Sequence, residues 1–280
     1  MKNYLLFNSK SSISKKSPKK NELLIELKKQ FNDLIELDLQ ELDESFFTQT
    51  LKNDDIVILT GGDGTINRYL NRYKKYHLKN ETYFYSNGTG NDFIRDINEK
   101  TNLIHLNKYL ENTPKVIVNG KESYFINNVG FGVDGDTCVV ADELKEKGKK
   151  KISYPKIAIK LLLFKCMKCD ADIIVDGKKY QYKNVFLAST FNGRYYGGGI
   201  MAAPEQNRFD NNLTLFVFEG LSRILTLLRY KSVFKGKHVK YKCVHIIKGK
   251  QIFVKFNHPV GLQVDGEVYK DITSYRAYKM

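Results

Sequence analysis

Leu59-Thr60-Gly61-Gly62-Asp63-Gly64-Thr65-Ile66-Asn67 is the stretch that decides how the first part of this chain folds. The run Asp55–Thr60 leading into it has the apolar pattern of a buried strand, and apolar residues recur at helical spacing from Ile66 to Tyr73. Glycines let the backbone approach a ligand closely, and a helix N-terminus favours phosphate because its N–H groups are unpaired. The stretch therefore predicts a phosphate-binding turn between a strand and a helix.

Asp63 lies inside this turn, where its carboxylate would repel a phosphate. It makes sense as a ligand of Mg²⁺, direct or through water, or as a base near the transferring phosphate. An ordinary turn with Thr65 as a helix cap explains the same residues without any ligand. The pattern matches neither the Walker motif nor the Rossmann motif.

A second glycine-rich loop, Ser86-Asn87-Gly88-Thr89-Gly90-Asn91-Asp92-Phe93-Ile94-Arg95, follows the short strand Thr82–Ser86. Loops that follow parallel strands share the carboxyl edge of the sheet, so we expect the two loops to face each other across a crevice. Thr89 and Asn91 offer hydrogen bonds there, and Arg95 offers a positive charge for phosphate.

The pattern of elements changes near residue 115. Before it, short apolar strands alternate with helical periods, including one over 23–34, which predicts an α/β nucleotide-binding domain with a parallel sheet over residues 1–115. After it, short strands are separated by Gly, Asn and Asp turns, and only two helical stretches interrupt them, near Pro155–Phe164 and Leu221–Phe234. This pattern predicts a C-terminal antiparallel β-sandwich domain over residues 116–269.

Positive charge is concentrated in the second half of the chain. The 280 residues include 46 Lys+Arg and 31 Asp+Glu, a net charge of +15. Residues 145–183 and 223–255 together carry +18, so the rest of the chain sums to −3. Such a field favours an anionic partner: nucleic acid, an acidic membrane surface or a phosphorylated substrate. Hydrophobic residues at 42% and charged residues at 28% argue against wholesale disorder.

The cysteines and the apolar runs indicate a cytoplasmic protein. Four cysteines in 280 residues are no disulfide scaffold. Cys166 and Cys169 could bind zinc together with Cys243 and His245, but a lone CxxC arises often by chance, and reduced thiols are the preferred interpretation. No apolar run reaches the roughly 20 residues of a membrane-spanning helix, and the N-terminal apolar stretch is too short for a signal peptide.

The two glycine loops carry a resemblance. GGDGT after a strand, followed by GTGNDF and Arg95, resembles the diacylglycerol kinase catalytic family, which includes soluble bacterial lipid kinases and is related to sphingosine and ceramide kinases and, more distantly, to NAD kinases. Four further segments resemble motifs of that family in the expected order: Asn8–Ser12, Asn128–Asp134, Phe191–Pro204 and Asp265-Gly266-Glu267. The resemblance covers nearly the whole chain. It implies an active site between the two domains, and it implies that the last strands, about 270–280, return to the first domain.

The resemblance also implies roles for individual residues. Asp265 would take the proton from the acceptor hydroxyl with help from Glu267, and Asp63 would act in catalysis by holding Mg²⁺ through water. The remaining residues would bind ATP, mainly through backbone N–H groups: Asn8, Thr60, Gly61, Gly62, Gly64, Thr65, Gly88, Thr89, Gly90, Asn91 and Arg95.

Some residues depart from the family pattern. Ser9 and Ser12 replace the Pro and Gly of the first loop, and Val116–Asn119 lacks an Asp found in the soluble bacterial enzymes. Asp210 lies where the family can hold a structural divalent ion, but Thr214 replaces a second Asp there. A Mg²⁺ site that has one carboxylate fewer binds the ion more weakly. Only the resemblance therefore supports Asp210 as a metal ligand.

The leading hypothesis is an ATP- and Mg²⁺-dependent lipid kinase, a phosphotransferase with an alcohol acceptor, attached peripherally to an anionic membrane. A NAD kinase-like enzyme with a soluble substrate is the alternative, although GTGNDF and the late DGE argue against it. A catalytically silent nucleotide-binding protein, or a basic protein that binds membrane or nucleic acid, is the alternative of another class. No nucleic-acid module is recognisable, so no nucleic acid is expected. The lipid and the oligomeric state, including a homodimer, stay open.

Overall fold

The computed structural model describes residues 1–8, 24–86, 91–149, 151–165, 168–220 and 222–279. The chain divides into two compact units, Met1–Asn112 and Thr113–Met280. The change in the sequence pattern predicts this boundary after residue 115. Each unit is described separately.

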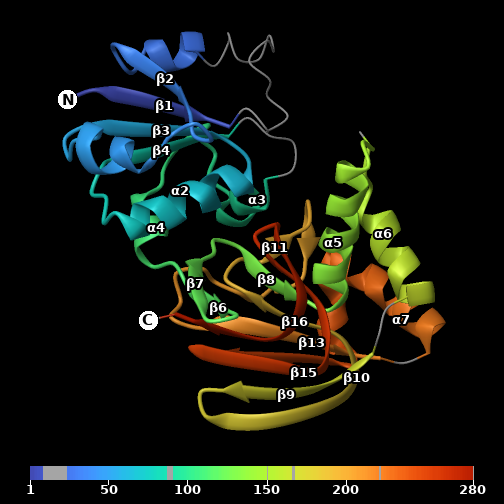
Figure 1. Cartoon of the computed structure of the whole chain (residues 1–280). Helices are drawn as coiled ribbons and strands as arrows, with labels where there is room; N and C mark the ends of the chain where they lie inside the picture. Colours follow the sequence, from blue (N-terminus) through green and yellow to red (C-terminus); the bar gives the residue numbers. More distant parts are fainter. Residues whose placement is uncertain (9–23, 87–90, 150, 166–167, 221, 280) are drawn as a thin grey trace. The chain divides into compact units, whose positions relative to one another are not determined.

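Unit 1 contains a five-stranded sheet in which four strands are parallel (Figure 1). The strand order is β2-β1-β3-β4-β5, and only β5 runs antiparallel to its neighbour. The predicted parallel α/β fold is therefore confirmed. The bounds are β1 (Asn3–Phe7), β2 (Leu34–Asp38), β3 (Ile56–Gly61), β4 (Thr82–Ser86) and β5 (Leu103–His105).

The strand order reverses at β1, whose neighbours are β2 on one side and β3 on the other. Phe7 and Thr60 are register partners, so Asn8 and the glycine turn leave the same edge of the sheet side by side. Open α/β sheets bind ligands at this kind of switch point, outside the carboxyl ends of the strands. The topology thus directs attention to the turn after β3.

The helices of unit 1 agree in part with the predicted spacing. α2 (Asp63–Lys75) buries Ile66, Tyr69, Leu70 and Tyr73, as predicted. The helix expected over 23–34 is too long, because helical residues end at 28 and Leu34 begins β2. Asp33, with φ +49, lies in the turn between these helical residues and β2. The remaining helical elements are η1 (Phe46–Thr50), α3 (Asp92–Ile97) and α4 (Asn107–Glu111).

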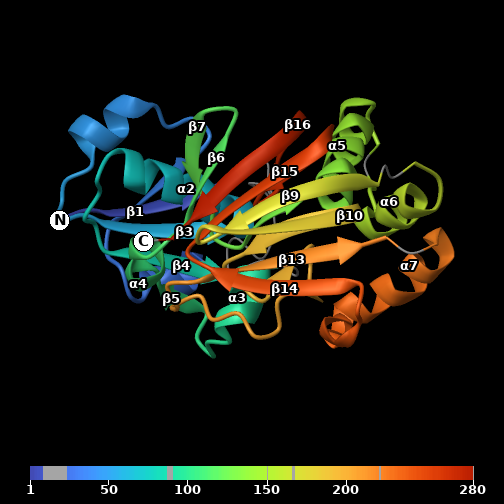
Figure 2. The ribbon, with the colours of Figure 1, turned by 90° about the horizontal axis from the view of Figure 1, so that it is seen from below.

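Unit 2 is built on an antiparallel sheet of nine strands (Figure 2). Eight strands follow the order β14-β13-β10-β8-β15-β16-β6-β7, and β9 pairs with both β10 and β15. Strands β8 and β9 thus occupy one position between the two long strands, at different heights. The bounds are β6 (Lys115–Val118), β7 (Lys121–Tyr124), β8 (Asn128–Phe131), β9 (Cys169–Val175), β10 (Lys178–Phe191), β13 (Leu213–Glu219), β14 (Val244–Gly249), β15 (Gln251–Val264) and β16 (Glu267–Tyr278), with a small pair β11 (Tyr195–Tyr196) and β12 (Ile200–Met201).

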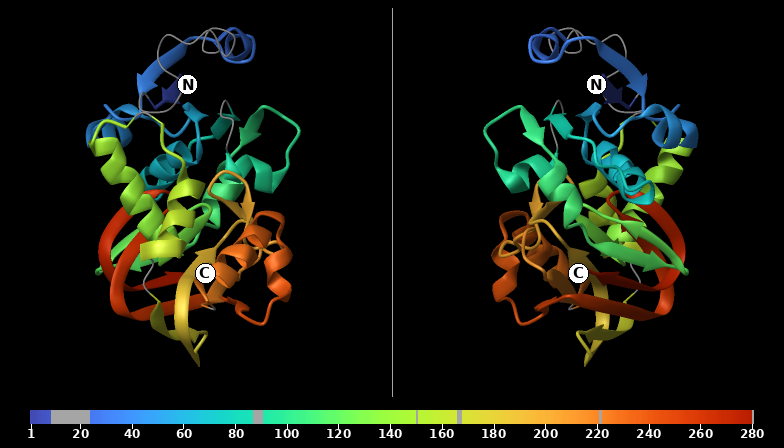
Figure 3. Two further views of the ribbon diagram at one scale, coloured as in Figure 1. Left: turned by 90° about the vertical axis from the view of Figure 1, so that its right-hand side faces the viewer. Right: turned by 90° about the vertical axis from the view of Figure 1, so that its left-hand side faces the viewer.

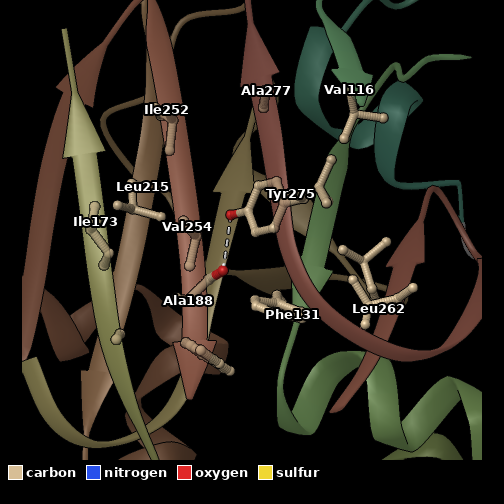
Figure 4. Packing of buried hydrophobic residues seen from close by; sticks show 14 of the residues in the cluster. Val116, Phe131, Ile173, Ala188, Leu215, Ile252, Val254, Leu262, Tyr275 and Ala277 are labelled. Carbon is tan, nitrogen blue, oxygen red and sulfur yellow. Dashed lines mark hydrogen bonds between the residues drawn. The ribbon is translucent and has the colours of Figure 1, made fainter. Parts of the chain in front are cut away.

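The sheet of unit 2 curls around its main hydrophobic cluster (Figure 4). The Tyr275 hydroxyl, on β16, donates to the Ala188 carbonyl of β10 at 2.9 Å and lies 2.8 Å from the Thr190 hydroxyl. Two other strands separate β16 from β10 in the sheet, so this contact crosses its concave side. Phe131 and Val254 are buried in the same cluster. The expected antiparallel, β-rich second domain is confirmed.

The last strand belongs to unit 2. Residues Glu267–Tyr278 pair with β15, and Arg276–Tyr278 also pair with β6. The expected return of residues 270–280 to the first domain is therefore wrong. The reason is local: Asp265 and Gly266 have φ of +46 and +91, the Asp-Gly hairpin turn that folds β16 directly back on β15.

Helices of unit 2 include one that the sequence patterns did not reveal. The two expected stretches form α6 (Tyr154–Lys160) with η2 (Leu161–Lys165), and α7 (Arg223–Tyr230) with η3 (Lys231–Lys235) and η4 (Lys237–Lys240). The expectation of only two is wrong, because α5 (Val133–Glu146) is also helical (Figure 3). Its early glycines and β-branched residues conceal the helical period. Within the described residues, no helix is long and apolar enough to cross a membrane.

Gly135 lets α5 pack directly on β15. A Cβ built at Gly135 would lie 1.9 Å from the Gly261 carbonyl oxygen, and the Asp136 carboxylate accepts the Gly261 N–H at 2.6 Å. Neither backbone can withdraw without breaking the hydrogen bonds of its own element.

We predict that Gly135→Ala lowers the free energy of unfolding by about 3 kcal/mol or more, because the added methyl group overlaps a fixed carbonyl. Urea denaturation measures the change. Gly64→Ala is the matched control: it is also helical, but a Cβ there meets no atom within 4 Å, so stability should be unchanged or slightly raised. Equal stability of the two variants would contradict this packing argument.

Candidate functional site

The glycine turn after β3 is shaped by Gly61. A Cβ at Gly61 would lie 2.2 Å from the Thr65 hydroxyl oxygen, so no other residue fits. The N-cap of α2 is Gly62, and no side-chain hydrogen bond caps this helix. Thr65 lies inside the helix, so the alternative in which Thr65 is the cap is not what the structure shows. A Cβ at Gly62 or Gly64 would meet nothing within 4 Å, which leaves the backbone at these positions open to a ligand.

Two buried hydroxyls in this turn fit a phosphate. The Thr60 and Thr65 hydroxyl oxygens are buried and have no hydrogen-bond partner among the described residues. Buried polar atoms are normally bonded, so an unpartnered pair beside open glycine backbone calls for a polar ligand. The N-terminus of the 13-residue helix α2 adds favourable charge for an anion. The residues present therefore fit the phosphates of ATP.

Asp63 connects the two glycine loops. Its carboxylate oxygens accept the backbone N–H groups of Asp92 at 2.8 Å and Phe93 at 3.0 Å. The Asn91 side chain accepts the N–H of Ile94 at 3.1 Å, so the first turn of α3 is capped by two acidic or amide side chains. Sequence analysis placed the two loops at one sheet edge but did not find this connection.

A carboxylate can accept more than two hydrogen bonds, so the capping role is compatible with a further role for Asp63. Its assignment to Mg²⁺ stays a prediction. The second loop is described only from Asn91 onward, and the expected ligand residues Gly88, Thr89 and Gly90 lie outside the described residues. The Arg95 guanidinium lies 3.9 Å from the Asp92 carboxylate and is largely exposed.

Asn8 lies at the carboxyl end of β1, where its predicted role requires it. Its side-chain oxygen accepts a hydrogen bond from Gln40 at 3.1 Å, and Gln40 accepts one from Arg68 of α2 at 2.6 Å. This chain connects the residue after β1 to the helix that begins at Asp63. It fixes the edge of the sheet on the side opposite the second loop.

In unit 2, Asp265 holds a short segment of backbone. Its carboxylate accepts the N–H groups of Ile126 at 2.5 Å, Asn127 at 2.9 Å and Asn128 at 3.0 Å. The Asp-Gly pair is thus both the hairpin turn discussed above and a fixed acceptor. Glu267 begins β16 and is exposed.

The same segment gathers other motif residues. The Asn192 amide and the Arg208 guanidinium donate to the Ile126 carbonyl at 3.0 Å and 2.9 Å. The backbone N–H of Asn192 donates to the Asn127 carbonyl at 2.8 Å. Three motifs that lie far apart in the sequence therefore meet at residues 126–128.

A buried lysine completes this polar network. The Lys279 ammonium donates to the Asn192 side chain at 2.9 Å and to the Arg208 carbonyl at 2.5 Å, and only 2% of the residue is exposed. Burial, with a smaller contribution from the Arg208 guanidinium, lowers the pKa of Lys279 to about 8, and Asp210 opposes the shift. In the sequence, a single lysine near the end of a β-strand gives no sign that its ammonium group is buried and hydrogen-bonded in this way.

The surroundings of Asp210 bear on its expected metal role. Asp210 is exposed and accepts the Asn207 side-chain N–H at 3.0 Å. The Thr214 hydroxyl, where the family has a second Asp, donates to Gln206 at 2.5 Å. Lys279 and Arg208 already supply positive charge to this region, which disfavours a further cation. The described residues contain no group of three His, Cys, Asp or Glu that could hold a metal ion.

Asp134 is a fully buried acid to which sequence analysis gave no role. Its two oxygens accept the hydroxyls of Ser189 at 2.7 Å and Tyr196 at 3.0 Å. Burial raises the pKa of its carboxyl to about 6 against the effect of these donors, and the Asp136 charge adds to the increase. The resemblance includes Asp134 as the last residue of the segment Asn128–Asp134, but it gives this acid no role.

The zinc alternative finds no support in the described part of the chain. Cys169 is buried in the main hydrophobic cluster of unit 2, and Cys243 accepts a hydrogen bond from Arg229 at 3.2 Å. His245 lies 2.9 Å from Glu219. Cys166 lies outside the described residues.

Comparison with protein families matches both units. The model of the diacylglycerol kinase catalytic domain matches residues 2–122, and the model of the YegS C-terminal NAD kinase beta sandwich-like domain matches residues 127–276. The second match alone spans more than half of the chain. The glycine turn, Asp63 and the second loop lie in the first match, and the network around residues 126–128 lies almost wholly in the second.

Individual relatives agree. A "putative lipid kinase" of Staphylococcus epidermidis is 26% identical over 239 residues, covering 79% of this chain and 75% of the relative. A second one, from Staphylococcus aureus, is 24% identical over 226 residues, covering 78% and 72%. A "putative diacylglycerol kinase" structure from Bacillus anthracis has a TM-score of 0.72 at 19% identity, covering 100% of this chain and 94% of that one. At this identity the structural match shows the fold alone.

We predict that Asp63→Asn lowers the free energy of unfolding by about 1–3 kcal/mol, because an amide can accept only one of the two N–H groups that the carboxylate caps. Urea denaturation measures this. Asp54→Asn is the control, because Asp54 is an exposed acid in an exposed ion pair with the N-terminal amine, and it should change stability by less than about 0.5 kcal/mol. If Asp63→Asn is as stable as the control, the carboxylate does not hold the second loop.

We predict that the stability of the protein relative to Lys279→Met rises between pH 8 and 10.5. The folded-state pKa of Lys279 is lowered to about 8, so in this window the unfolded chain binds more protons and folding becomes easier as pH rises. The expected gain between pH 7 and 10.5 is about 3 kcal/mol. Denaturation of both proteins at pH 7, 8, 9 and 10.5 measures it, and a difference that does not vary with pH would contradict the assignment.

Proposed function

The chain belongs to the diacylglycerol kinase catalytic-domain family, and on that premise we propose that it is an ATP- and Mg²⁺-dependent lipid kinase. The proposed reaction transfers the terminal phosphoryl group of ATP to the hydroxyl of a lipid, such as diacylglycerol, at an anionic membrane surface. One observation supports this proposal most: an open glycine turn at the switch point of a parallel sheet, lined by buried unpartnered hydroxyls.

The nucleotide would be held by backbone. The backbone N–H groups of Gly62 and Gly64, at the start of α2, can donate to phosphate oxygens. The buried Thr60 and Thr65 hydroxyls can form hydrogen bonds to the same phosphate. Asp63 cannot contact phosphate without repulsion, but it can hold a metal-bound water while it caps α3. Mg²⁺ supplies neutralisation of the charge that develops on the transferring group.

Asp265 is the proposed proton acceptor. Three backbone donors fix its position. Position matters more than high basicity here, because phosphoryl transfer passes through a loose transition state that depends mainly on positioning and charge. Exposed Glu267, two residues further on, can assist at the metal or at the hydroxyl.

We predict that the purified protein transfers labelled phosphate from ATP with Mg²⁺ to at least one lipid alcohol in mixed micelles. Diacylglycerol, a sphingoid base and undecaprenol are the acceptors to test, and NAD is the soluble alternative. Asp265→Asn should reduce the rate constant by roughly 100-fold or more. Asp271→Asn, an exposed acid of the strand that follows Asp265, is the matched control.

Circular dichroism shows whether each variant is folded, so a loss of stability is not mistaken for a loss of chemistry. If the protein transfers phosphate to NAD and to no lipid, its acceptor is a soluble molecule, and the lipid part of the proposal is wrong. No transfer to any acceptor would refute the kinase proposal, and a wild-type rate in Asp265→Asn would remove Asp265 as the base.

A further inference from the structure

Exposed apolar side chains gather in one part of unit 2. Of the twelve large hydrophobic side chains that are exposed among the described residues, eight lie in residues 154–164 and 224–239. The most exposed are Phe164 at 69%, Ile224 at 68% and Leu228 at 58%. A group of this kind differs from the scattered single exposures that are normal on protein surfaces.

These residues lie on neighbouring elements. α7 packs against η2, which ends just after Phe164, and α7 lies beside α6 in Figures 1 and 2. Ile224, Leu225 and Leu228 occupy one face of α7, because they are spaced by one, three and four residues. On the other side of the helix, Tyr230 is buried in the hydrophobic cluster that also contains Leu161, Leu162 and Val233 of the adjoining elements. The exposed side chains are therefore presented by helices whose opposite sides are anchored.

Lysine surrounds this apolar group. Lys156, Lys160 and Lys165 are exposed on α6 and η2, and four more exposed lysines lie in residues 231–240. Neither 151–165 nor 222–240 contains an acid. α5, which packs against α6 and η2, carries acids, and two of them already pair with lysines: Asp142 with Lys145 at 2.6 Å, and Glu143 with Lys270 at 3.2 Å. The surface thus combines exposed apolar side chains with a local excess of positive charge.

We propose that this apolar–lysine face, formed by α6, η2, α7, η3 and η4, docks on an anionic lipid bilayer. Apolar side chains would enter the boundary between headgroups and acyl chains, and the lysines would contact anionic headgroups, which is how interfacial helices bind. A second copy of the chain fits less well, because two faces with seven exposed lysines each would repel one another. Nucleic acid would satisfy the lysines but not Phe164, Ile224 and Leu228.

The proposal deepens the proposed function, since docking would bring the enzyme to a lipid acceptor, but the binding itself can be measured without ATP. We expect the wild-type protein to co-sediment with vesicles of equimolar phosphatidylcholine and phosphatidylglycerol, more weakly at high salt, and far less with phosphatidylcholine alone. Ile224→Asn/Leu228→Asn should reduce the partition coefficient by about tenfold or more. Ile25→Asn/Ile35→Asn, exposed apolar residues of unit 1, should leave it unchanged.

The charge contribution has its own pair of variants. Lys231→Glu/Lys235→Glu should remove the preference for phosphatidylglycerol, whereas Lys28→Glu/Lys29→Glu, exposed lysines of unit 1, should not. Phosphoryl transfer to a short-chain, water-soluble acceptor without vesicles should be unchanged in all four variants. This readout separates failure of docking from failure of the kinase proposal.

Several results would overturn the proposal: no wild-type binding to anionic vesicles, equal binding by Ile224→Asn/Leu228→Asn, or equal binding to both kinds of vesicle. A wild-type dimer that the same substitutions dissociate, seen by sedimentation without lipid, would assign the face to a second copy instead. Binding to a DNA duplex that the lysine variants abolish and the apolar variants do not would assign it to nucleic acid.

Discussion

A backbone N–H group that is buried away from water must find a hydrogen-bond acceptor. In each unit, one carboxylate accepts several such N–H groups at once. Asp63 accepts two N–H groups at the start of α3, and Asp265 accepts three from residues 126–128. An unpaired buried N–H costs about 1–3 kcal/mol. Each of these two carboxylates therefore stabilises the conformation of the loop whose N–H groups it accepts. The glycine turn, the second loop and the network of unit 2 all depend on this constraint.

The same carboxylates are the ones to which the proposed reaction assigns chemistry. An acid fixed by backbone donors cannot rotate away from its partners, and phosphoryl transfer benefits more from fixed position than from high basicity. Structure and mechanism are therefore not competing explanations of Asp63 and Asp265. The open glycine backbone and the unpartnered hydroxyls of Thr60 and Thr65 show where a polar ligand would be bound.

Unit 2 also retains buried ionisable groups at a cost. Asp134 is surrounded by hydroxyls rather than by a cation, and Lys279 is bonded only to neutral oxygens. Their pKa values shift toward the neutral forms for the same reason, because burial penalises charge. On the surface of the same unit, apolar residues of α7 are exposed among lysines. Apolar side chains are normally buried and lysines are normally paired with acids, so this surface departs from both tendencies.

Local patterns were sufficient for much of this molecule. The strand–glycine–helix order around Asp63, the parallel sheet and the antiparallel second unit followed from apolar spacing and turn residues, since these signals come from neighbours in the chain. The local rules failed at α5, where Gly135, which contacts β15, obscures the helical period, and at Leu34, which continues a helical pattern but pairs with β1.

By itself, therefore, the sequence determined the two fold classes, the glycine turn and the identity of the acids at the candidate site. Only the tertiary structure decided that Asp63 caps α3, that Asp265 holds residues 126–128 and that Lys279 is buried. Each of these depends on hydrogen bonds between residues far apart in the chain, and such partners are chosen by three-dimensional packing, which no local pattern records.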